Sequence, residues 1–150
     1  MTVIEALQAC ALFKEFTETG IRIFATIAVE KEIEAGAPLF VEGMAGESLF
    51  ILRSGQVRVT QKDTKGEREL ALLGPGEQLG ALGLLARSTR LVSVVAVGAC
   101  EVIELTQRDF ARLQPQKPQA CLKLALAIAG DVAARAAENR DQLRELTPRK

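Results

Sequence analysis

The 150-residue sequence contains no histidine, no tryptophan and no tyrosine. The absence of histidine removes imidazole as a general acid or base, as the partner of a serine or cysteine nucleophile, and as a metal ligand. A small barrel enzyme of the cupin type would normally need histidines to hold its metal. The composition therefore favours a protein that is not an enzyme and that holds no metal ion.

Cysteine is scarce and scattered. Cys10, Cys100 and Cys121 are odd in number, far apart and without CxxC spacing. Such a set predicts neither a disulfide framework nor a zinc site. We expect three buried, reduced thiols.

The sequence also lacks an excess of either charge and any long apolar run. It has 19 basic and 19 acidic residues, so it offers no general attraction to nucleic acid or to an anionic membrane. No stretch of about 18 apolar residues is present, and the N-terminus carries Glu5 where a signal peptide would be basic. We expect a cytoplasmic protein with one domain.

The sequence divides into three successive segments that differ in their pattern of apolar residues. Residues 1–27 show helical spacing of apolar side chains and a helix-start signal at Thr17. Residues 28–113 consist of short apolar or alternating runs separated by glycines: AVEKEIEA, PLFVE, SLFILRS, QVRVTQ, ERELALL, RLVSVVAV and CEVIEL. Short strands at such intervals are typical of an antiparallel roll or barrel rather than of βαβ units. The fold class predicted is mainly β, with flanking helices.

Residues 116–146 predict one long helix with a heptad pattern. The pattern consists of positions spaced alternately by three and four residues: Leu122, Ala125, Ala129, Val132, Ala136, Asn139, Leu143 and Leu146. A strict period of 3.5 residues favours a coiled-coil homodimer, and a polar residue such as Asn139 fixes register in paired helices. The alternative is a surface helix that covers its own roll.

Several stretches resemble the cyclic-nucleotide-binding domain family, which includes catabolite activators, kinase regulatory subunits and gated channels. They are LF at residues 12–13, EAGAPLFVEGMAGESLFILRSGQVRV at 34–59, Gly66, and GPGEQLG from residue 74. The resemblance implies a jelly-roll-like β-roll with N-terminal helices and a long C-terminal helix. It also implies a regulatory role in signalling, and small bacterial signalling proteins are the context it suggests.

Members of that family that bind a nucleotide hold its phosphate and ribose in one loop, whose pattern is Gly, Glu, apolar residues, then Arg and two small residues. The resemblance therefore implies that the pocket residues here are Gly80, Ala81, Leu82, Arg90, Leu91 and Val92. Two features depart from the pattern. Ala81 replaces the acid that accepts the ribose hydroxyl, and Leu91 and Val92 replace the small pair, where they are expected to crowd the phosphate. Cyclic AMP or cyclic GMP would then bind weakly.

Two functions follow from these features. The first is a dimeric regulatory scaffold with a degenerate pocket, acting on an unidentified protein partner. The second is a sensor of a cyclic nucleotide or an altered anion, using Arg90 and the Gly80 loop. Arg90 itself is a phosphate ligand, an ordinary salt-bridge residue paired with Glu77 or Glu47, or a solvated loop arginine. Arg87 is expected to be solvated on the loop rather than to add a second positive charge to an anion site. A DNA-binding role is not expected, because only TPRK follows Leu146.

Overall fold

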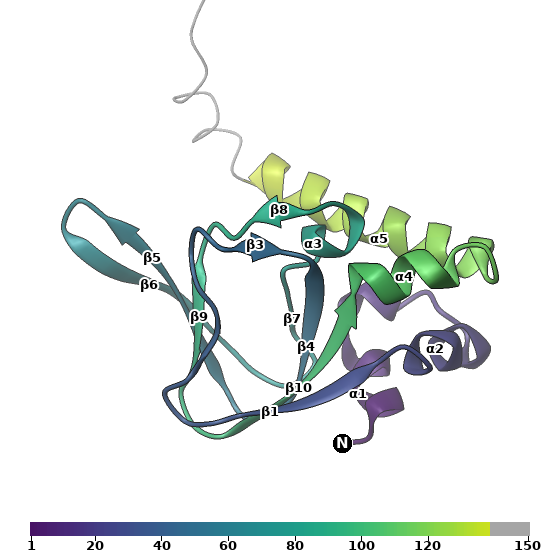
Figure 1. Ribbon diagram of the computed structural model, residues 1–150, viewed down its shortest axis with the longest axis horizontal. Coiled ribbons are helices and arrows are strands. Elements are labelled where there is room, and N and C mark those ends of the chain that lie inside the picture. The colour runs from purple at the N-terminus through teal and green to yellow at the C-terminus, as the bar shows by residue number, and fades with distance from the viewer. Residues whose placement is uncertain (139–150) are drawn as a thin grey trace, which may run out of the picture.

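The computed structural model describes residues 1–138, which form an antiparallel β-roll with the helices gathered at one end (Figure 1). The helices are α1 (Val3–Ala9), η1 (Ala11–Phe13), α2 (Glu18–Ala25), α3 (Leu82–Leu85), α4 (Gln107–Leu113) and α5 (Pro118–Glu138). The strands are β1 (Val29–Ile33), β2 (Pro38–Phe40), β3 (Ala45–Gly46), β4 (Ser48–Ser54), β5 (Val57–Asp63), β6 (Gly66–Leu73), β7 (Gln78–Leu79), β8 (Ser88–Thr89), β9 (Ser93–Ala96) and β10 (Cys100–Thr106). The predicted fold class is confirmed.

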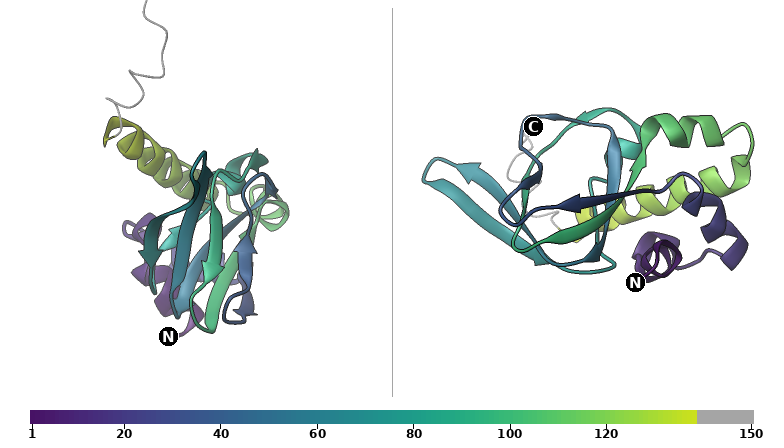
Figure 2. Two further views of the ribbon diagram at one scale, coloured as in Figure 1. Left: turned by 90° about the vertical axis from the view of Figure 1, so that its left-hand side faces the viewer. Right: turned by 60° about the horizontal axis from the view of Figure 1, so that its bottom comes forward.

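Two antiparallel sheets make the roll. One has the strand order β1-β10-β4-β7 and the other β2-β9-β5-β6, and β3 and β8 form a short separate pair. The β5–β6 hairpin projects away from the body at the end opposite the helices (Figure 2). The two long hairpin strands pair from Val57 with Leu73 to Asp63 with Gly66. The hairpin and the helices thus lie at opposite ends of the roll.

Strand β4 separates two hydrophobic cores and explains why its sequence is a continuous apolar run. Leu49 and Ile51 face the core built with the helices, whereas Phe50 and Leu52 face the interior of the roll. A strand covered on both faces loses the alternation of apolar and polar residues. The run SLFIL therefore marks the strand that joins the helices to the roll.

The N-terminal helices begin where the capping residues predict. Thr2 and Glu5 form a reciprocal capping box at the start of α1, with nitrogen-to-oxygen distances of 3.0 and 3.1 Å. The Thr17 hydroxyl accepts the N–H of Gly20 at 3.2 Å and starts α2. Chain direction changes at Cys10, which is extended, so that η1 can place Phe13 4.9 Å from the ring of Phe16.

The roll ends earlier than the predicted boundary at residue 113. Its last strand stops at Thr106, whose hydroxyl accepts the N–H of Asp109 at 3.1 Å and caps α4. Phe110 and Leu113 of this helix are buried. The sequence TQRD contains a helix-start signal, because its threonine is followed three residues later by an acid. The signal directly follows the strand-like run CEVIEL, so the prediction extended the roll past it.

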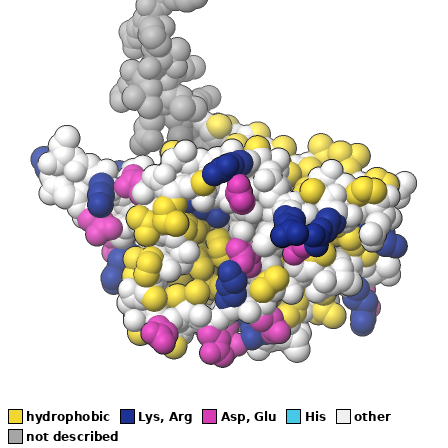
Figure 3. Space-filling model, viewed as in Figure 1, with side chains coloured by type: hydrophobic (Ala, Val, Ile, Leu, Met, Phe, Trp, Pro, Cys, Tyr) yellow, Lys and Arg dark blue, Asp and Glu magenta, His cyan; other side chains and the backbone are white. Residues whose placement is uncertain are grey.

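The long helix α5 presents two apolar faces. Its inner face buries Cys121, Leu124 and Ile128 against the core of the N-terminal helices. The predicted heptad positions do not share one face: Leu122, Ala129 and Ala136 are exposed on the outer side and Ala125 is half-buried, whereas Val132 is half-buried and packs against the core. Apolar side chains are visible along this edge in Figure 3. The remaining heptad positions, Asn139, Leu143 and Leu146, lie outside the described residues. Thus α5 covers the domain, as the alternative supposed, and still leaves an outer apolar stripe.

All three cysteines are free and buried, as expected. Burial raises the pKa of the Cys10 thiol from 9.0 to about 11 and also raises the pKa of Cys121. A raised folded-state pKa favours the protonated thiol, so this contribution of Cys10 to stability is complete below about pH 9 and is lost as the pH rises towards about 11.

We expect the thiols of the folded protein to resist a disulfide reagent such as DTNB at pH 8. The thiolate is the reactive species; burial blocks access to all three thiols, and it disfavours the thiolate of Cys10 and Cys121, whose pKa it raises. The measurement is the rate of reagent release with and without denaturant, which should expose all three thiols. Rapid reaction of any thiol in the folded protein at pH 8 would contradict this expectation.

Within residues 1–138, no helix has the length and apolar character needed to cross a membrane. The same residues contain no group of three or more cysteine, aspartate and glutamate side chains placed to hold a metal ion.

Candidate functional site

The loop between β7 and β9 brings the predicted site residues together. Gly80, with φ of +74°, turns the chain out of β7 into the short helix α3. After α3 the chain is extended through β8 and reaches Arg90. All six predicted residues line one pocket with a volume of about 780 Å³: Gly80, Ala81, Leu82, Arg90, Leu91 and Val92.

Arg90 is the buried centre of this loop. Only 7% of its surface is exposed. Its Nη1 donates to the carbonyl of Gly80 at 3.3 Å and its Nη2 to the carbonyl of Ser48 at 3.0 Å. The guanidinium carbon lies 4.3 Å from the centroid of the Phe40 ring, a cation–π contact. Arg90 thereby ties the loop to β4 and rests on the wall of the roll.

The two carboxylates considered as partners of Arg90 are engaged elsewhere. Glu77 accepts the N–H of Gly74 at 2.6 Å, and Glu47 pairs with Arg87 at 3.2 Å. Neither forms a salt bridge with Arg90, so that alternative is not the arrangement found. The Arg87 pair is exposed on both sides, and the solvated position expected for Arg87 agrees with it.

The charge of Arg90 has no direct counter-ion among residues 1–138. Burial lowers the pKa of its guanidinium, and the more distant charge of Glu104 opposes that effect. Glu104 itself accepts the Ser48 hydroxyl at 2.6 Å and pairs with Lys31 at 2.6 Å. A guanidinium has five N–H donors and stays protonated at neutral pH. Two donors are used here, which leaves donors for an anion in the pocket.

Two glycines make room for this side chain. A Cβ atom on Gly46 would lie 2.5 Å from Nε of Arg90, and one on Gly80 would clash with its Nη1. Gly46 lies in β3 and does not have a positive φ, so no turn requires a glycine there. Its role could not be found from the sequence, because Arg90 is distant along the chain and only the fold brings the two together.

The opposite wall of the pocket comes from α5. Asp131, Val132 and Arg135 line it, and none of these was predicted as a pocket residue. The Asp131 carboxylate accepts from Gln78 Nε2 at 3.3 Å and pairs with Arg135 at 3.1 Å. The contact with Gln78 fastens the middle of α5 to β7, whereas the pair with Arg135 lies within α5. A molecule in the pocket would therefore touch both the roll and the terminal helix.

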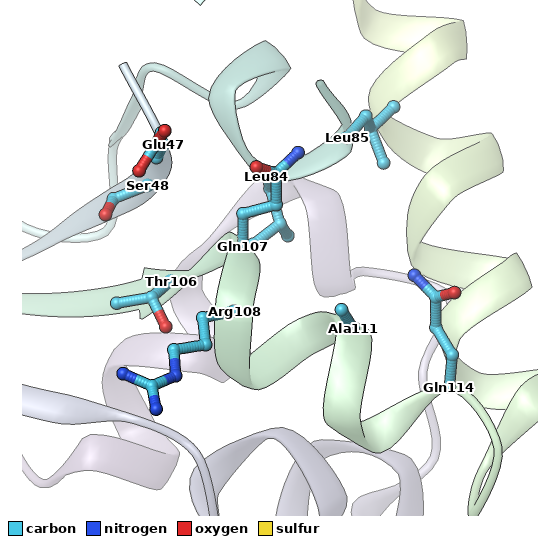
Figure 4. Close-up of a pocket in the computed structure, with 9 residues that line it drawn as sticks. All are labelled: Glu47, Ser48, Leu84, Leu85, Thr106, Gln107, Arg108, Ala111 and Gln114. Carbon is cyan, nitrogen blue, oxygen red and sulfur yellow. The ribbon is translucent and has the colours of Figure 1, made fainter. Parts of the chain in front are cut away.

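A second hollow of about 530 Å³ lies between α3, α4 and the start of β4. Its polar side chains include Glu47, Arg108 and Gln114, and the ends of Arg108 and Gln114 lie at opposite sides of it (Figure 4). All three of these residues are exposed, unlike Arg90 in the larger pocket. We therefore assign the candidate site to the larger pocket.

The fold defines a class of β-roll domains in which a pocket lies between a glycine-bearing loop and a terminal helix. Residues 30–116 match the cyclic nucleotide-binding domain, and the chain belongs to that family. The resemblance seen in the sequence is confirmed.

Two similar structures support the assignment. The catabolite activator protein of Thermus thermophilus superposes with a TM-score of 0.79 at 31% identity, over 91% of this chain and 62% of that chain. A cyclic nucleotide-binding-like protein from Brucella abortus gives a TM-score of 0.67 at 31% identity, over 75% of this chain and 97% of its own.

The curated relatives are longer. The cyclic AMP receptor protein of Thermus thermophilus is 39% identical over 95 residues, which cover 63% of this chain and 44% of the relative. Glutaminase 2 of Bradyrhizobium diazoefficiens is 33% identical over 125 residues, which cover 83% of this chain and 19% of the relative. The chain thus spans less than half the length of these relatives. Domains of this family also occur within larger proteins whose names describe enzymes.

Proposed function

We propose that this domain is a non-enzymatic regulatory module that binds a small anionic ligand in the pocket between the roll and α5. The observation that carries the proposal is Arg90, a buried guanidinium without a direct counter-ion among the described residues, lining a pocket of about 780 Å³. Pockets for small ligands commonly have volumes of about 300–1,000 Å³. The charge and the volume both suit an anion of nucleotide size or smaller.

The pocket is degenerate towards cyclic nucleotides in this proposal. A regulatory domain of Toxoplasma gondii protein kinase A, solved with cyclic AMP, is 32% identical over 73% of this chain. Here Ala81 has no carboxylate for the ribose hydroxyl. A hydrogen bond to a charged group contributes about 1.5–3 kcal/mol, so its absence weakens binding by roughly 10- to 150-fold. Cyclic AMP and cyclic GMP are then weak ligands that Arg90 still recognises.

Isothermal titration with cyclic AMP and cyclic GMP tests this proposal, with Arg90→Lys as the matched variant. Lysine keeps the positive charge but lacks the fork of donors that suits phosphate oxygens. We expect weak binding that the substitution reduces by at least tenfold. If inorganic phosphate and both nucleotides give no heat at millimolar concentration, the anion-binding function fails.

A dimeric scaffold that acts through protein contacts is the second candidate, and the outer face of α5 favours it. Leu122 is 59% exposed and Leu126 is 63% exposed, and exposed alanines continue the same stripe. A helix that is apolar on two faces in one chain is suited to pair with another helix. In this candidate the partner on the stripe is a second copy of the chain.

We expect Leu122→Glu combined with Leu126→Glu to convert such a dimer into a monomer. Both side chains are exposed in the single chain, so the fold should tolerate the change, while two acids on each paired helix would repel. The measurement is molar mass by light scattering after size exclusion. Ala134→Glu is the control, because it adds an acid at an exposed position on another face of α5. A dimer that survives the double substitution would show that α5 does not pair through this stripe.

A further inference from the structure

Three exposed leucines surround the pocket that contains Arg90. Leu70 is 43% exposed, Leu82 is 48% exposed and Leu91 is 72% exposed, and all three line this pocket. They come from separate parts of the chain: β6, α3 and the segment after β8. Single exposed leucines are ordinary on a protein surface, but several that converge on one cavity mark a binding site.

A β-bulge accounts for the position of Leu70. Along the β5–β6 hairpin, Val59 pairs with Ala71 and Thr60 pairs with Glu69, so Leu70 has no partner across the strands. An extra residue of this kind changes where side chains point on the bulged strand. Without the bulge, regular alternation would place Leu70 on the opposite face of β6 from its neighbours Ala71 and Glu69. With the bulge, Leu70 lines the pocket together with its neighbour Ala71.

The remaining walls offer few unpaired polar groups. Phe40, Val59 and Leu79 line the pocket and belong to the apolar core of the roll. The two carboxylates that line it, Glu77 and Asp131, are already hydrogen-bonded to the backbone of Gly74 and to Gln78. The polar groups nearest to Arg90 along the chain are the hydroxyls of Ser88 and Thr89, which also line the pocket. Polar groups are thus gathered around Arg90 and along the α5 wall, where Asp131 contacts Gln78 and Arg135, and much of the remaining lining is apolar.

We infer that the preferred ligand is a small amphipathic anion, with one phosphate or carboxylate head group held by Arg90 and an apolar chain or ring against Leu70, Leu82 and Leu91. This inference rests on the proposed anion-binding function and names its ligand class. A ribonucleotide would instead press hydroxyls against leucine side chains without partners, which opposes binding. An alkyl or aryl group gains from the same surface, by about fourfold in affinity for each methylene that it buries.

The test is a titration series of ethyl, butyl, hexyl and octyl phosphate, with octanoate as the carboxylate arm. Affinity should rise by roughly fourfold per methylene over part of the series. The triple variant Leu70→Ser/Leu82→Ser/Leu91→Ser should flatten the rise, lowering the affinity for octyl phosphate much more than the affinity for ethyl phosphate. Leu91→Ser alone, at the most exposed of the three positions, serves as the second variant if the triple variant is poorly folded.

The controls separate this inference from the function on which it rests. If every alkyl phosphate binds equally and all binding is lost in Arg90→Lys, the anion site stands and the apolar preference is overturned. If neither the alkyl phosphates nor cyclic AMP bind, both fail. If the affinities of the alkyl phosphates rise with chain length but are not lowered by Arg90→Lys, the binding is non-specific adsorption and the inference is overturned. If Arg90 accepts a carboxylate as well as a phosphate, octanoate should bind more tightly than acetate because only octanoate carries a long apolar chain. Equal binding of octanoate and acetate would count against the inference.

Discussion

Arg90→Ala should lower the free energy of unfolding by about 2–4 kcal/mol, in addition to removing anion binding. Two carbonyl groups, those of Ser48 and Gly80, lose their donor. Each acceptor left without a partner costs roughly 1–3 kcal/mol when it is buried, and the cavity beside Phe40 adds to the loss. The loop would also lose its attachment to β4. An arginine that looks like a ligand-binding residue therefore has a structural role as well.

The measurement is urea unfolding of the two proteins without ligand. Arg87→Ala is the matched control, because Arg87 lies in the same loop and its pair with Glu47 is exposed, with 71% and 54% of the two side chains accessible. Exposed ion pairs of this kind contribute about 0–1 kcal/mol. If Arg90→Ala is no more destabilised than Arg87→Ala, the bonds to Ser48 and Gly80 do not hold the loop.

The features that could be predicted from the sequence are those encoded locally. Thr17 marks the start of α2 because its hydroxyl accepts a bond from three residues along the chain. The apolar run SLFIL marks the strand buried on both faces, and three glycines that separate apolar runs in the sequence, Gly43, Gly55 and Gly66, have positive φ. Short-range hydrogen bonds and turn geometry depend on residues only a few positions apart, so a short stretch of sequence is enough to predict them.

The features that could not be predicted depend on contacts between distant segments. Gly46 is needed because Arg90 passes beside it, and Asp131 reaches the pocket only because α5 folds back along β7. Leu91 was expected to crowd the pocket interior, yet it is 72% exposed and contributes to the rim. The direction in which a loop side chain points is set by the whole loop, and no local pattern encodes it.

The terminal helix shows the same limit in another form. Its sequence contains two overlapping apolar periodicities, and the one through Leu124 and Ile128 faces the domain core. The heptad positions Leu122 and Ala129 face outwards. Periodicity alone identifies an amphipathic helix, but it does not predict which of two apolar stripes packs against the rest of the same domain. That choice is made by the packing of the N-terminal helices against α5.

Ala81→Glu is expected to strengthen cyclic AMP binding by roughly 10- to 150-fold, because the new carboxylate can accept the ribose 2′-hydroxyl as a charge-assisted hydrogen bond. Ala81 lines the pocket beside Gly80, whose carbonyl already accepts a bond from Arg90. The positive charge of Arg90 near this position would offset part of the cost of burying a carboxylate. Ala81 is only 7% exposed and also packs in the helical core, so we expect a loss of stability of about 1 kcal/mol without ligand.

The measurement compares cyclic AMP with its 2′-deoxy analogue by isothermal titration. The original protein should bind the two equally, because it has no carboxylate at residue 81, whereas the variant should prefer cyclic AMP by at least tenfold. Adding Leu91→Ala should change the preference for cyclic AMP over the deoxy analogue little, since Leu91 lies at the exposed rim of the pocket. A gain that the deoxy analogue shares would show that the substitution acts through the charge of the loop rather than through the ribose. No gain in either the single or the double variant would show that the backbone of residues 80–92 no longer presents this position to a nucleotide.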